Sequence, residues 1–171
     1  MTTIRLLQGE ITDNLIIEKK NGAGWITFND PARHNAMSYD MWVAIPKVIK
    51  MFEEDDEVRV IVLTGAGGKS FVSGANISQF EKLRTAADAV AEYERVGEEA
   101  QGSIYNTFKP VIGRIDGYCI GGGLNLSLCC DVRIASDASS FAIPAGRLGL
   151  GYRLTAIRNL VTTVGAAQAL D

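Results

Sequence analysis

The stretch from Lys109 to Pro144 constrains the fold more than any other part of the chain. It begins with Lys109-Pro110, and a residue before proline is biased toward extended backbone. Val111 to Tyr118 is rich in β-branched and aromatic residues, which predicts a strand. Three glycines, Gly121 to Gly123, then precede an apolar run, Leu124 to Cys130, that predicts a helix. The order strand, glycines, helix and second strand indicates one working α/β unit.

The three glycines admit two interpretations. The first amides of a helix have no partner within it and carry partial positive charge, so they favour an anion or a developing oxyanion. Glycine lets a ligand approach such amides closely. Alternatively, the glycines serve only to pack the helix tightly against a sheet. The triplet by itself leaves both interpretations open.

A second glycine-bearing motif lies upstream. The sequence FVSGANI spans Phe71 to Ile77 and follows an apolar run, Val58 to Thr64, that predicts a buried strand. Together with KPVIGRIDGYCIGGGLNLSLCCDVRIAS, it resembles the enoyl-CoA hydratase/isomerase family, also called the crotonase family. Two further motifs, PARHNAM and FAIPAGRLGLG, occur in the order found in that family. The resemblance therefore covers nearly the whole chain, and four ordered motifs are more specific than any one of them.

The resemblance implies a fold. It predicts an α/β chain wound as a crotonase-like spiral of ββα units, in a single domain that spans residues 1–171. Alternating strands and helices support the α/β class independently, whereas the spiral comes from the resemblance alone. In the family, helices that cover the acyl pocket and join subunits begin where this chain ends, at GAAQALD. We therefore expect the C-terminal helical part to be missing.

The resemblance also implies a site that binds an acyl-CoA thioester. The backbone N–H groups of Ala75 and Gly122 would hold the thioester oxygen as it becomes an enolate, and neither role needs a side chain. Losing one donor of this kind typically costs about 10²–10³ in rate. The expected substrate-binding positions are Arg33, Ala36, Gly74, Asn76, Ile77, Gly121, Ala145 and Tyr152.

The chain departs from the family at the two positions that carry glutamates in the hydratases. Asn125 and Ala145 stand there instead. Asn125 can hydrogen-bond but cannot take up a proton near neutral pH, and Ala145 can do neither. A positioned acid or base contributes about 10²–10⁴ in rate, so we expect hydration by the two-glutamate route to be severely impaired.

The expected function is that of an acyl-CoA enzyme of this family, a lyase or isomerase of the kind used in fatty acid metabolism. Asn125 counts as a catalytic position because it would position substrate or water. The alternative is a non-catalytic acyl-CoA binding or assembly protein of the same fold. Arg147 and Tyr152 could orient a substrate, or could serve as a surface residue and a packing residue.

A nucleotide-binding module is a third possibility, because Gly68-Lys69-Ser70 matches the end of a phosphate-binding loop. The spacing argues against it. The first glycine of that motif should occupy position 63, which is Leu63, and a dinucleotide pattern that starts at Gly65 would need glycine in place of Ser70. We interpret the segment as a turn before the first oxyanion donor.

Two other groups of residues invite functional interpretations. His34, the only histidine, could be a general base, although a solvated loop position is the simpler interpretation. A run of charges on a predicted long helix indicates a solvated face, with an outside possibility of catalysis. These charged residues are Glu92, Glu94, Arg95, Glu98 and Glu99.

Composition limits the partners and the compartment. A net charge of -3 gives no general attraction to nucleic acid, and no apolar run is long enough to span a membrane or resembles a signal peptide. We expect a cytoplasmic protein. Cys119, Cys129 and Cys130 lack metal-ligand spacing, which predicts reduced core residues and no metal site. The resemblance implies coenzyme A as part of the substrate, no other cofactor, and a homotrimer or a dimer of trimers (a hexamer).

The remaining elements follow from local patterns. Asn21-Gly22 predicts a hairpin turn between two short strands, and Ser38 can cap an apolar-striped helix. Thr85 and Asp88 match a capping box at the start of the long helix. We also expect a short helix at residues 77–83 and a last helix with an apolar stripe at Leu154, Ile157, Leu160, Val161 and Val164, closed by Gly165.

Overall fold

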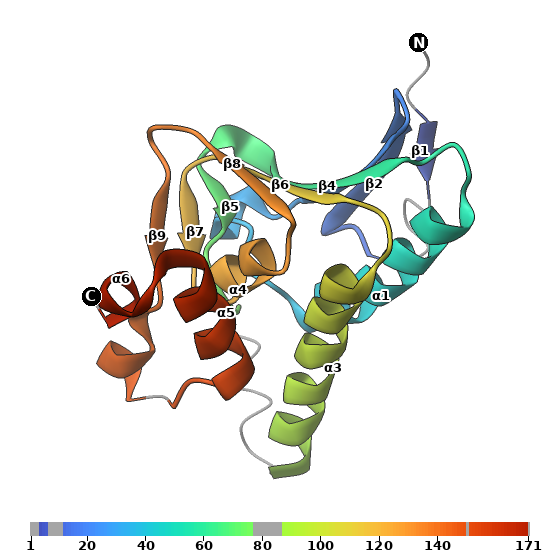
Figure 1. Ribbon diagram of the computed structural model, residues 1–171. Coiled ribbons are helices and arrows are strands. Elements are labelled where there is room, and N and C mark those ends of the chain that lie inside the picture. The colour runs from blue at the N-terminus through green and yellow to red at the C-terminus, as the bar shows by residue number, and fades with distance from the viewer. Residues whose placement is uncertain (1–3, 7–11, 77–86, 150, 171) are drawn as a thin grey trace.

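The structure is a computed structural model that describes residues 4–6, 12–76, 87–149 and 151–170. It contains a six-stranded sheet of order β1-β2-β3-β4-β6-β8 and a three-stranded sheet of order β5-β7-β9 (Figure 1). The large sheet is formed by β1 Ile4–Leu6, β2 Leu15–Lys20, β3 Ala23–Phe28, β4 Val60–Gly65, β6 Val111–Ile115 and β8 Val132–Ala135. The small sheet is formed by β5 Ser70–Val72, β7 Tyr118–Ile120 and β9 Ser140–Ala142.

The helices cover these sheets and fill the space between them (Figure 1). The described α-helices are α1 Tyr39–Glu54, α3 Ala87–Asn106, α4 Gly122–Leu128, α5 Leu154–Val164 and α6 Ala166–Leu170. Three short 3-10 helices are η1 Pro31–Arg33, η2 Ala66–Gly68 and η3 Pro144–Leu148. Within the described part of the chain, no helix is both long enough and apolar enough to cross a membrane.

The chain winds between the two sheets as a spiral. β4, β6 and β8 are parallel neighbours in the large sheet, and β5, β7 and β9 are parallel neighbours in the small sheet. Each turn of the chain therefore adds one strand to each sheet. The predicted α/β spiral is confirmed by this topology and by the solved structures described below.

The prediction of one strand from Val111 to Tyr118 is wrong. The chain leaves the large sheet after Ile115 and enters the small sheet at Tyr118. Gly117 lies at the crossing with φ +73°, and a Cβ there would lie 2.0 Å from the Lys69 carbonyl oxygen. Only glycine fits this close approach of two chain segments, and β-propensity does not show which sheet a residue joins.

The other local predictions can be compared with the structure directly. Asn21 (φ 57°) and Gly22 (φ 78°) turn β2 into β3, as the hairpin pattern predicted. The Ser38 side chain accepts a hydrogen bond from the Met41 amide and begins α1. β1 and α6 were not predicted. The short helix expected at 77–83 and the capping residue Thr85 lie outside the described residues.

The hydrophobic core lies between the large sheet and the pair α1 and α3. The buried residues of α1 recur at helical spacing, and α3 adds a stripe of three. Pro46 lies inside α1 and is half-buried. The buried apolar side chains of the two helices are Met41, Trp42, Ala44, Ile45, Val48, Ile49, Phe52, Val96, Ala100 and Ile104.

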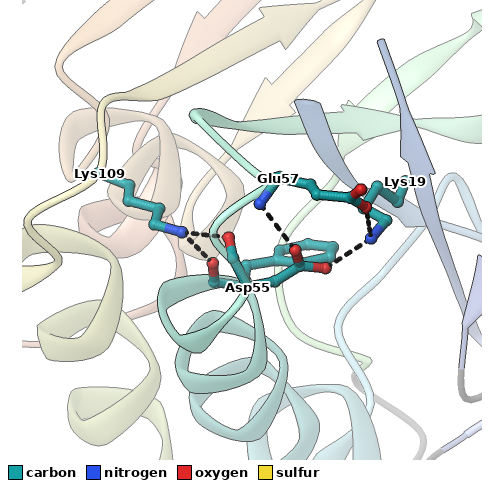
Figure 2. A network of polar contacts seen from close by, with 5 residues as sticks. Lys19, Asp55, Glu57 and Lys109 are labelled. Carbon is teal, nitrogen blue, oxygen red and sulfur yellow. Dashed lines mark hydrogen bonds and ion pairs between the residues drawn. The ribbon is translucent and has the colours of Figure 1, made fainter. Parts of the chain in front are cut away.

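A polar network holds the C-terminal end of α1 (Figure 2). Lys109 Nζ donates to the carbonyl oxygens of Phe52 (2.5 Å) and Asp55 (2.7 Å), which lack partners further along the helix. Lys19 Nζ pairs with the carboxylates of Asp55 (2.8 Å) and Glu57 (2.6 Å). The network thus ties β2, the end of α1 and the segment before β6 together.

This network predicts an acid-sensitive contribution to stability. The Lys19 hydrogen bond, with a second from the Glu57 amide, holds the pKa of Asp55 below its ordinary value. A depressed carboxyl pKa stabilises the fold above the unfolded-state pKa of about 4, and this contribution is lost as pH falls through the folded-state pKa. Denaturation of the wild type and Asp55→Asn between pH 2 and 6 should show the wild-type advantage shrinking toward low pH. A constant difference between the two proteins would contradict the assignment.

All three cysteines are buried and free of disulfide bonds, as predicted. Burial raises the pKa of Cys119 to about 12 and that of Cys129 to about 11, and it raises the pKa of Cys130 further. A thiol that stays protonated is a poor nucleophile. We expect iodoacetamide at pH 8 to leave the folded protein unmodified and to alkylate all three thiols in denaturant, as read by intact mass. Rapid labelling of the native protein would show that the core opens.

The apolar stripe predicted for the last helix is present on α5 but is largely exposed. Leu154 is 81% exposed, and within α5 only Ala156 is buried. Gly165 ends the helix with φ 82°, as predicted. Exposed apolar residues also occur on β8 and β9. The exposed large apolar residues of this end of the chain are Val132, Ile134, Phe141, Leu154, Ile157, Val161, Val164 and Leu170.

Candidate functional site

Three predicted site positions follow the three strands of the small sheet. Ala75 comes after β5, Gly122 after β7 and Ala145 after β9. Because these strands are parallel neighbours, their carboxyl ends share one edge of the sheet. Ligands of open α/β sheets bind at such edges. The sheet therefore places the glycine-bearing turns next to one another.

The turns after β5 and β7 are in contact. A Cβ on Gly121 would lie 3.9 Å from the Gly74 Cα, and one on Gly122 would lie 4.0 Å from the Gly74 carbonyl carbon. That carbon is bonded to the amide nitrogen of Ala75. Gly74 (φ 113°) and Gly121 (φ 53°) both adopt backbone conformations that favour glycine. The peptide units that carry the Ala75 and Gly122 amides are thus neighbours.

These two amides have no acceptor among the described residues. Gly122 is the first residue of α4, where an amide has no partner within the helix. α4 has only seven residues. Any attraction of this turn for an anion therefore comes from its individual N–H groups rather than from the dipole of a long helix.

Gly123, unlike Gly122, has a packing role between α4 and β5. A Cβ there would lie 2.2 Å from the Val72 carbonyl oxygen and 2.7 Å from the Val72 Cβ. Helix α4 can lie against β5 only because this position has no side chain. The packing interpretation of the triplet therefore applies to Gly123, and the amide interpretation stays a prediction for Gly122.

The loop before α1 runs beside the turn after β5. The Met37 amide donates to the Gly74 carbonyl (2.8 Å) and the Asn76 amide donates to the Met37 carbonyl (2.9 Å). The Ser73 amide donates to the carbonyl of His34 (3.1 Å). This pairing brings the loop that carries the expected positions Arg33 and Ala36 next to Gly74.

Asn35 anchors this loop, and sequence reasoning missed it. Its side chain is fully buried and donates to the carbonyls of Ala66 (2.9 Å) and Ser70 (2.7 Å). It also accepts from the Asp30 amide (3.0 Å). Its φ of 57° is a conformation that asparagine adopts more readily than most residues. The sequence offers no local signal for this role, because the carbonyls that Asn35 contacts lie more than thirty residues away along the chain.

The other expected binding positions near this loop differ in exposure. Arg33 is mostly exposed and pairs with Asp30 at 3.1 Å, whereas Ala36 and Asn76 are buried. His34 is exposed, as its simpler interpretation predicted, and its ring meets Tyr118 edge to face at 5.9 Å. Ile77 lies outside the described residues.

A cavity of about 190 Å³ opens next to the Gly122 turn. Trp42 lines it, and the Trp42 ring lies 3.4 Å from where a Gly122 Cβ would be. Asn125 lines it from the first turn of α4. The complete lining is Trp42, Tyr93, Glu94, Gly97, Glu98, Gln101, Asn125, Gly151, Tyr152, Arg153 and Ala156. Ala75 and Gly122 are not part of this lining. The lining residues nearest the Gly122 turn are Trp42 and Asn125.

Hydrogen bonds hold the hydroxyl groups of the two cavity tyrosines, Tyr93 and Tyr152, in place. Trp42 Nε1 donates to the Tyr93 hydroxyl at 3.0 Å, and the Tyr152 hydroxyl donates to the Gly121 carbonyl oxygen at 3.4 Å. Burial raises the pKa of both tyrosines. A hydrogen bond from Asn125 partly offsets this rise at Tyr152. Both phenols are therefore neutral near pH 7.

Two carboxylates of the charged helix face form the rim of the cavity. Arg153 pairs with Glu94 at 2.9 Å and also with Glu98. Both carboxylates are more than half exposed. They belong to the solvated face expected of α3, but the pairing with Arg153 joins α3 to the start of α5. The spacing of residues in the sequence does not predict this contact, because Arg153 lies far from Glu94 and Glu98 along the chain.

Ala145 and Arg147 lie in η3, after β9. Ala145 is buried and outside the lining of the smaller cavity. Arg147 lines a separate hollow of about 600 Å³ between α4, β9 and the last two helices. Tyr152 therefore lines the same cavity as Asn125, whereas Arg147 lines a different one.

Among the described residues, no group of three or more His, Cys, Asp or Glu side chains could hold a metal ion.

Comparisons with known proteins agree with the motif order. Residues 18–171 match the family model described as Enoyl-CoA hydratase/isomerase. The short-chain-enoyl-CoA hydratase of Clostridium acetobutylicum is 34% identical over 157 residues, which cover 92% of this chain and 59% of that protein. The Delta(3,5)-Delta(2,4)-dienoyl-CoA isomerase of Arabidopsis thaliana is 31% identical over 85% of this chain and 56% of its own length.

A solved structure shows the same fold. The crystal structure of an enoyl-CoA hydratase/isomerase family protein from Hyphomonas neptunium superposes with a TM-score of 0.88 at 33% identity. The match covers 91% of this chain and 60% of that one. The chain therefore spans about 60% of the length of the relatives it matches. Matching motifs, family model and fold together show that the chain belongs to the enoyl-CoA hydratase/isomerase family.

Proposed function

We propose that the chain acts on an acyl-CoA thioester whose carbonyl oxygen is held by the amides of Ala75 and Gly122 as an enolate forms. The observation that carries the proposal is the contact between the two turns, in which the Gly74–Ala75 and Gly121–Gly122 peptide units are neighbours. Preorganised donors aimed at developing charge are often the largest single catalytic contribution. The family membership supplies the class of substrate.

The reaction differs from two-glutamate hydration. Asn125 and Ala145 bring no proton acceptor to the site, and the neutral Tyr152 phenol near Asn125 is a poor base near pH 7. Asn125 positions substrate or water, and any proton moves through water, the substrate or another residue. The candidate reactions are isomerisation, hydrolysis, decarboxylation and carbon–carbon bond chemistry.

A panel of acyl-CoA thioesters tests this function. The panel contains saturated, enoyl, hydroxyacyl, branched and carboxyacyl thioesters, and mass spectrometry reads both the acyl product and free coenzyme A. Turnover of at least one member is the expected result. Failure to turn over any member, with a protein that folds by circular dichroism, would count decisively against an enzymatic role.

A non-catalytic acyl-CoA binding or assembly protein is the second candidate. The loss of both glutamates, at Asn125 and Ala145, favours it. It predicts saturable acyl-CoA binding by calorimetry with no product. Turnover that falls when Asn125 is changed to alanine would eliminate it.

We also propose a homotrimer or a dimer of trimers, as the family resemblance implied. Apolar side chains exposed on α5, β8 and β9 could be covered in such an assembly. Size-exclusion chromatography with light scattering measures the mass directly. A monomer at micromolar concentration would contradict this assembly.

A further inference from the structure

The hollow of about 600 Å³ lies between α4, β9, η3 and the helices α5 and α6. These elements gather at one end of the molecule (Figure 1). The hollow shares no described lining residue with the cavity of about 190 Å³ beside Asn125. Small-molecule sites typically measure about 300–1,000 Å³. The hollow is therefore large enough for a ligand of its own, apart from the proposed thioester site.

Apolar side chains form most of the wall of this hollow. Leu124 and Leu128 come from α4, and Leu160 and Val164 come from α5. Phe141 of β9 adds an exposed aromatic ring. Moving an alkyl chain from water onto such a wall is favourable in proportion to the apolar area removed from water. The wall thus favours a ligand with an apolar body.

Two arginines, Arg133 and Arg147, also line the hollow, and none of its described lining residues is Asp or Glu. Neither arginine forms an ion pair with a described carboxylate. A wall that carries one sign of charge next to apolar surface concentrates ions of the opposite sign. The ligand that suits this hollow is therefore an anion as well as apolar.

Arg133 is held in place by the end of α4. Its Nη1 donates to the carbonyl oxygens of Ser127 (3.0 Å) and Cys130, near the C-terminal end of that helix, where carbonyls lack helical partners. Its Nε and Nη2 have no acceptor among the described residues. The planar guanidinium fork matches a carboxylate, to which it can donate two parallel hydrogen bonds. A fixed arginine with donors to spare is suited to that role.

Charge complementarity also decides against a second copy of the chain as the occupant. An isologous contact over the hollow would bring the arginines of both copies together, and like charges oppose such a contact. A fatty acid instead combines a carboxylate and an apolar body in one molecule. A cavity of about 150 Å³ holds the six carbon atoms of benzene, so 600 Å³ accommodates roughly ten to sixteen carbons with a hydrated carboxylate.

We propose that this hollow binds a fatty acid of about ten to sixteen carbon atoms, whose carboxylate is held by Arg133 and Arg147 and whose alkyl chain lies against α4 and α5. This site is additional to the proposed thioester site and does not depend on turnover there. Its ligand is a free carboxylate, without coenzyme A.

Isothermal titration calorimetry with three ligands tests the site: decanoate, 1-decanol and hexanoate, each below its solubility limit. Decanoate should bind saturably, with one molecule per chain. It should bind at least about tenfold more tightly than 1-decanol, because a hydrogen bond to a charged group contributes that much or more. It should also bind at least about tenfold more tightly than hexanoate, because four further CH₂ groups leave water.

Variants assign the binding to this hollow. Arg147→Gln removes one exposed guanidinium and should weaken decanoate binding about tenfold without weakening 1-decanol binding. Arg158→Gln makes the same change of net charge at an exposed arginine of α5 outside the lining, and should leave both affinities intact. Gly97→Leu narrows the smaller cavity, where nothing lies within 4 Å of an added Cβ, and should also leave them intact.

Three outcomes overturn the inference. The first is no saturable binding of decanoate, including the case in which light scattering shows an oligomer whose second copy covers the hollow. The second is an equal loss of affinity in Arg147→Gln and Arg158→Gln, which would mean a general effect of charge. The third is a loss in Gly97→Leu with none in Arg147→Gln, which would place the ligand in the smaller cavity. The proposed function is tested separately by the acyl-CoA panel.

Discussion

Replacing Gly122 with proline lowers kcat by about 10²–10³ relative to Gly122→Ala, because proline removes one of the two proposed oxyanion donors. The position is suited to this substitution. Gly122 is the first residue of α4, where proline is well tolerated. Gly121, with φ 53° and ψ −114°, has the mirror-image extended conformation that glycine can adopt before proline.

Gly122→Ala is the matched control. It adds a Cβ at the same point, 3.4 Å from the Trp42 ring, and it keeps the N–H group. Both variants therefore share the added Cβ, and the proline variant in addition replaces the N–H with the Cδ of its ring. The measurement is single-turnover rate with the best acyl-CoA of the panel. Equal rates for the two variants would show that the Gly122 amide does not touch the reacting oxygen.

A second, independent readout comes from the bound thioester. Hydrogen bonds to a carbonyl oxygen weaken the C=O bond, so difference infrared spectra of a carbonyl-labelled acyl-CoA should show a lowered stretching frequency on binding. Gly122→Pro should reduce that shift, and Gly122→Ala should preserve it. This measurement needs binding alone and so applies even if the protein does not turn the thioester over.

Gly123→Ala should cause a large loss of stability. The new methyl group would lie 2.2 Å from the Val72 carbonyl oxygen, and both partners are backbone-bound groups that cannot rotate away. Overpacking of a core by one methyl group typically costs about 1–3 kcal/mol. Because the clash here is with backbone, we expect a loss of about 3 kcal/mol or more, by chemical denaturation, or failure to fold.

Gly102→Ala supplies the comparison for that experiment. Gly102 lies within α3, where an added Cβ would meet only the Asn106 side chain at the ordinary distance of 3.8 Å. Alanine is favoured over glycine in a helix interior by about 1 kcal/mol. Gly102→Ala should therefore be neutral or stabilising. Equal effects of the two substitutions would mean that α4 does not pack on β5 as described.

Local chemistry made much of this fold predictable. Asn21-Gly22 specified the first hairpin, and Ser38 specified the start of α1, because each acts through its own backbone neighbourhood. The glycine triplet predicted the beginning of α4 for the same reason. The site positions Ala75, Gly122 and Asn125 came from motif order and the resemblance, and their roles remain predictions.

Tertiary contacts account for what sequence reasoning missed. Residues 111–118 form two strands in different sheets, and strand propensity cannot distinguish the sheets. Asn35 bonds to carbonyls more than thirty residues away. The contact of Tyr152 with Gly121 and the pairing of Arg153 with Glu94 likewise depend on how α3, α4 and α5 pack. No periodicity or short motif encodes such distances.

The spiral separates the proposed chemistry of this chain from its proposed substrate selectivity. Both proposed donors are main-chain groups fixed by the adjacency of β5 and β7, whereas α3 and the residues after η3 supply most of the cavity wall. Helix α3 lies between β5 and β6 in the chain, outside both donor turns. Mutations in α3 should therefore reshape the proposed acyl compartment without displacing the proposed donors. The winding of the chain would thus let the proposed acyl compartment change mainly through segments that carry neither proposed donor.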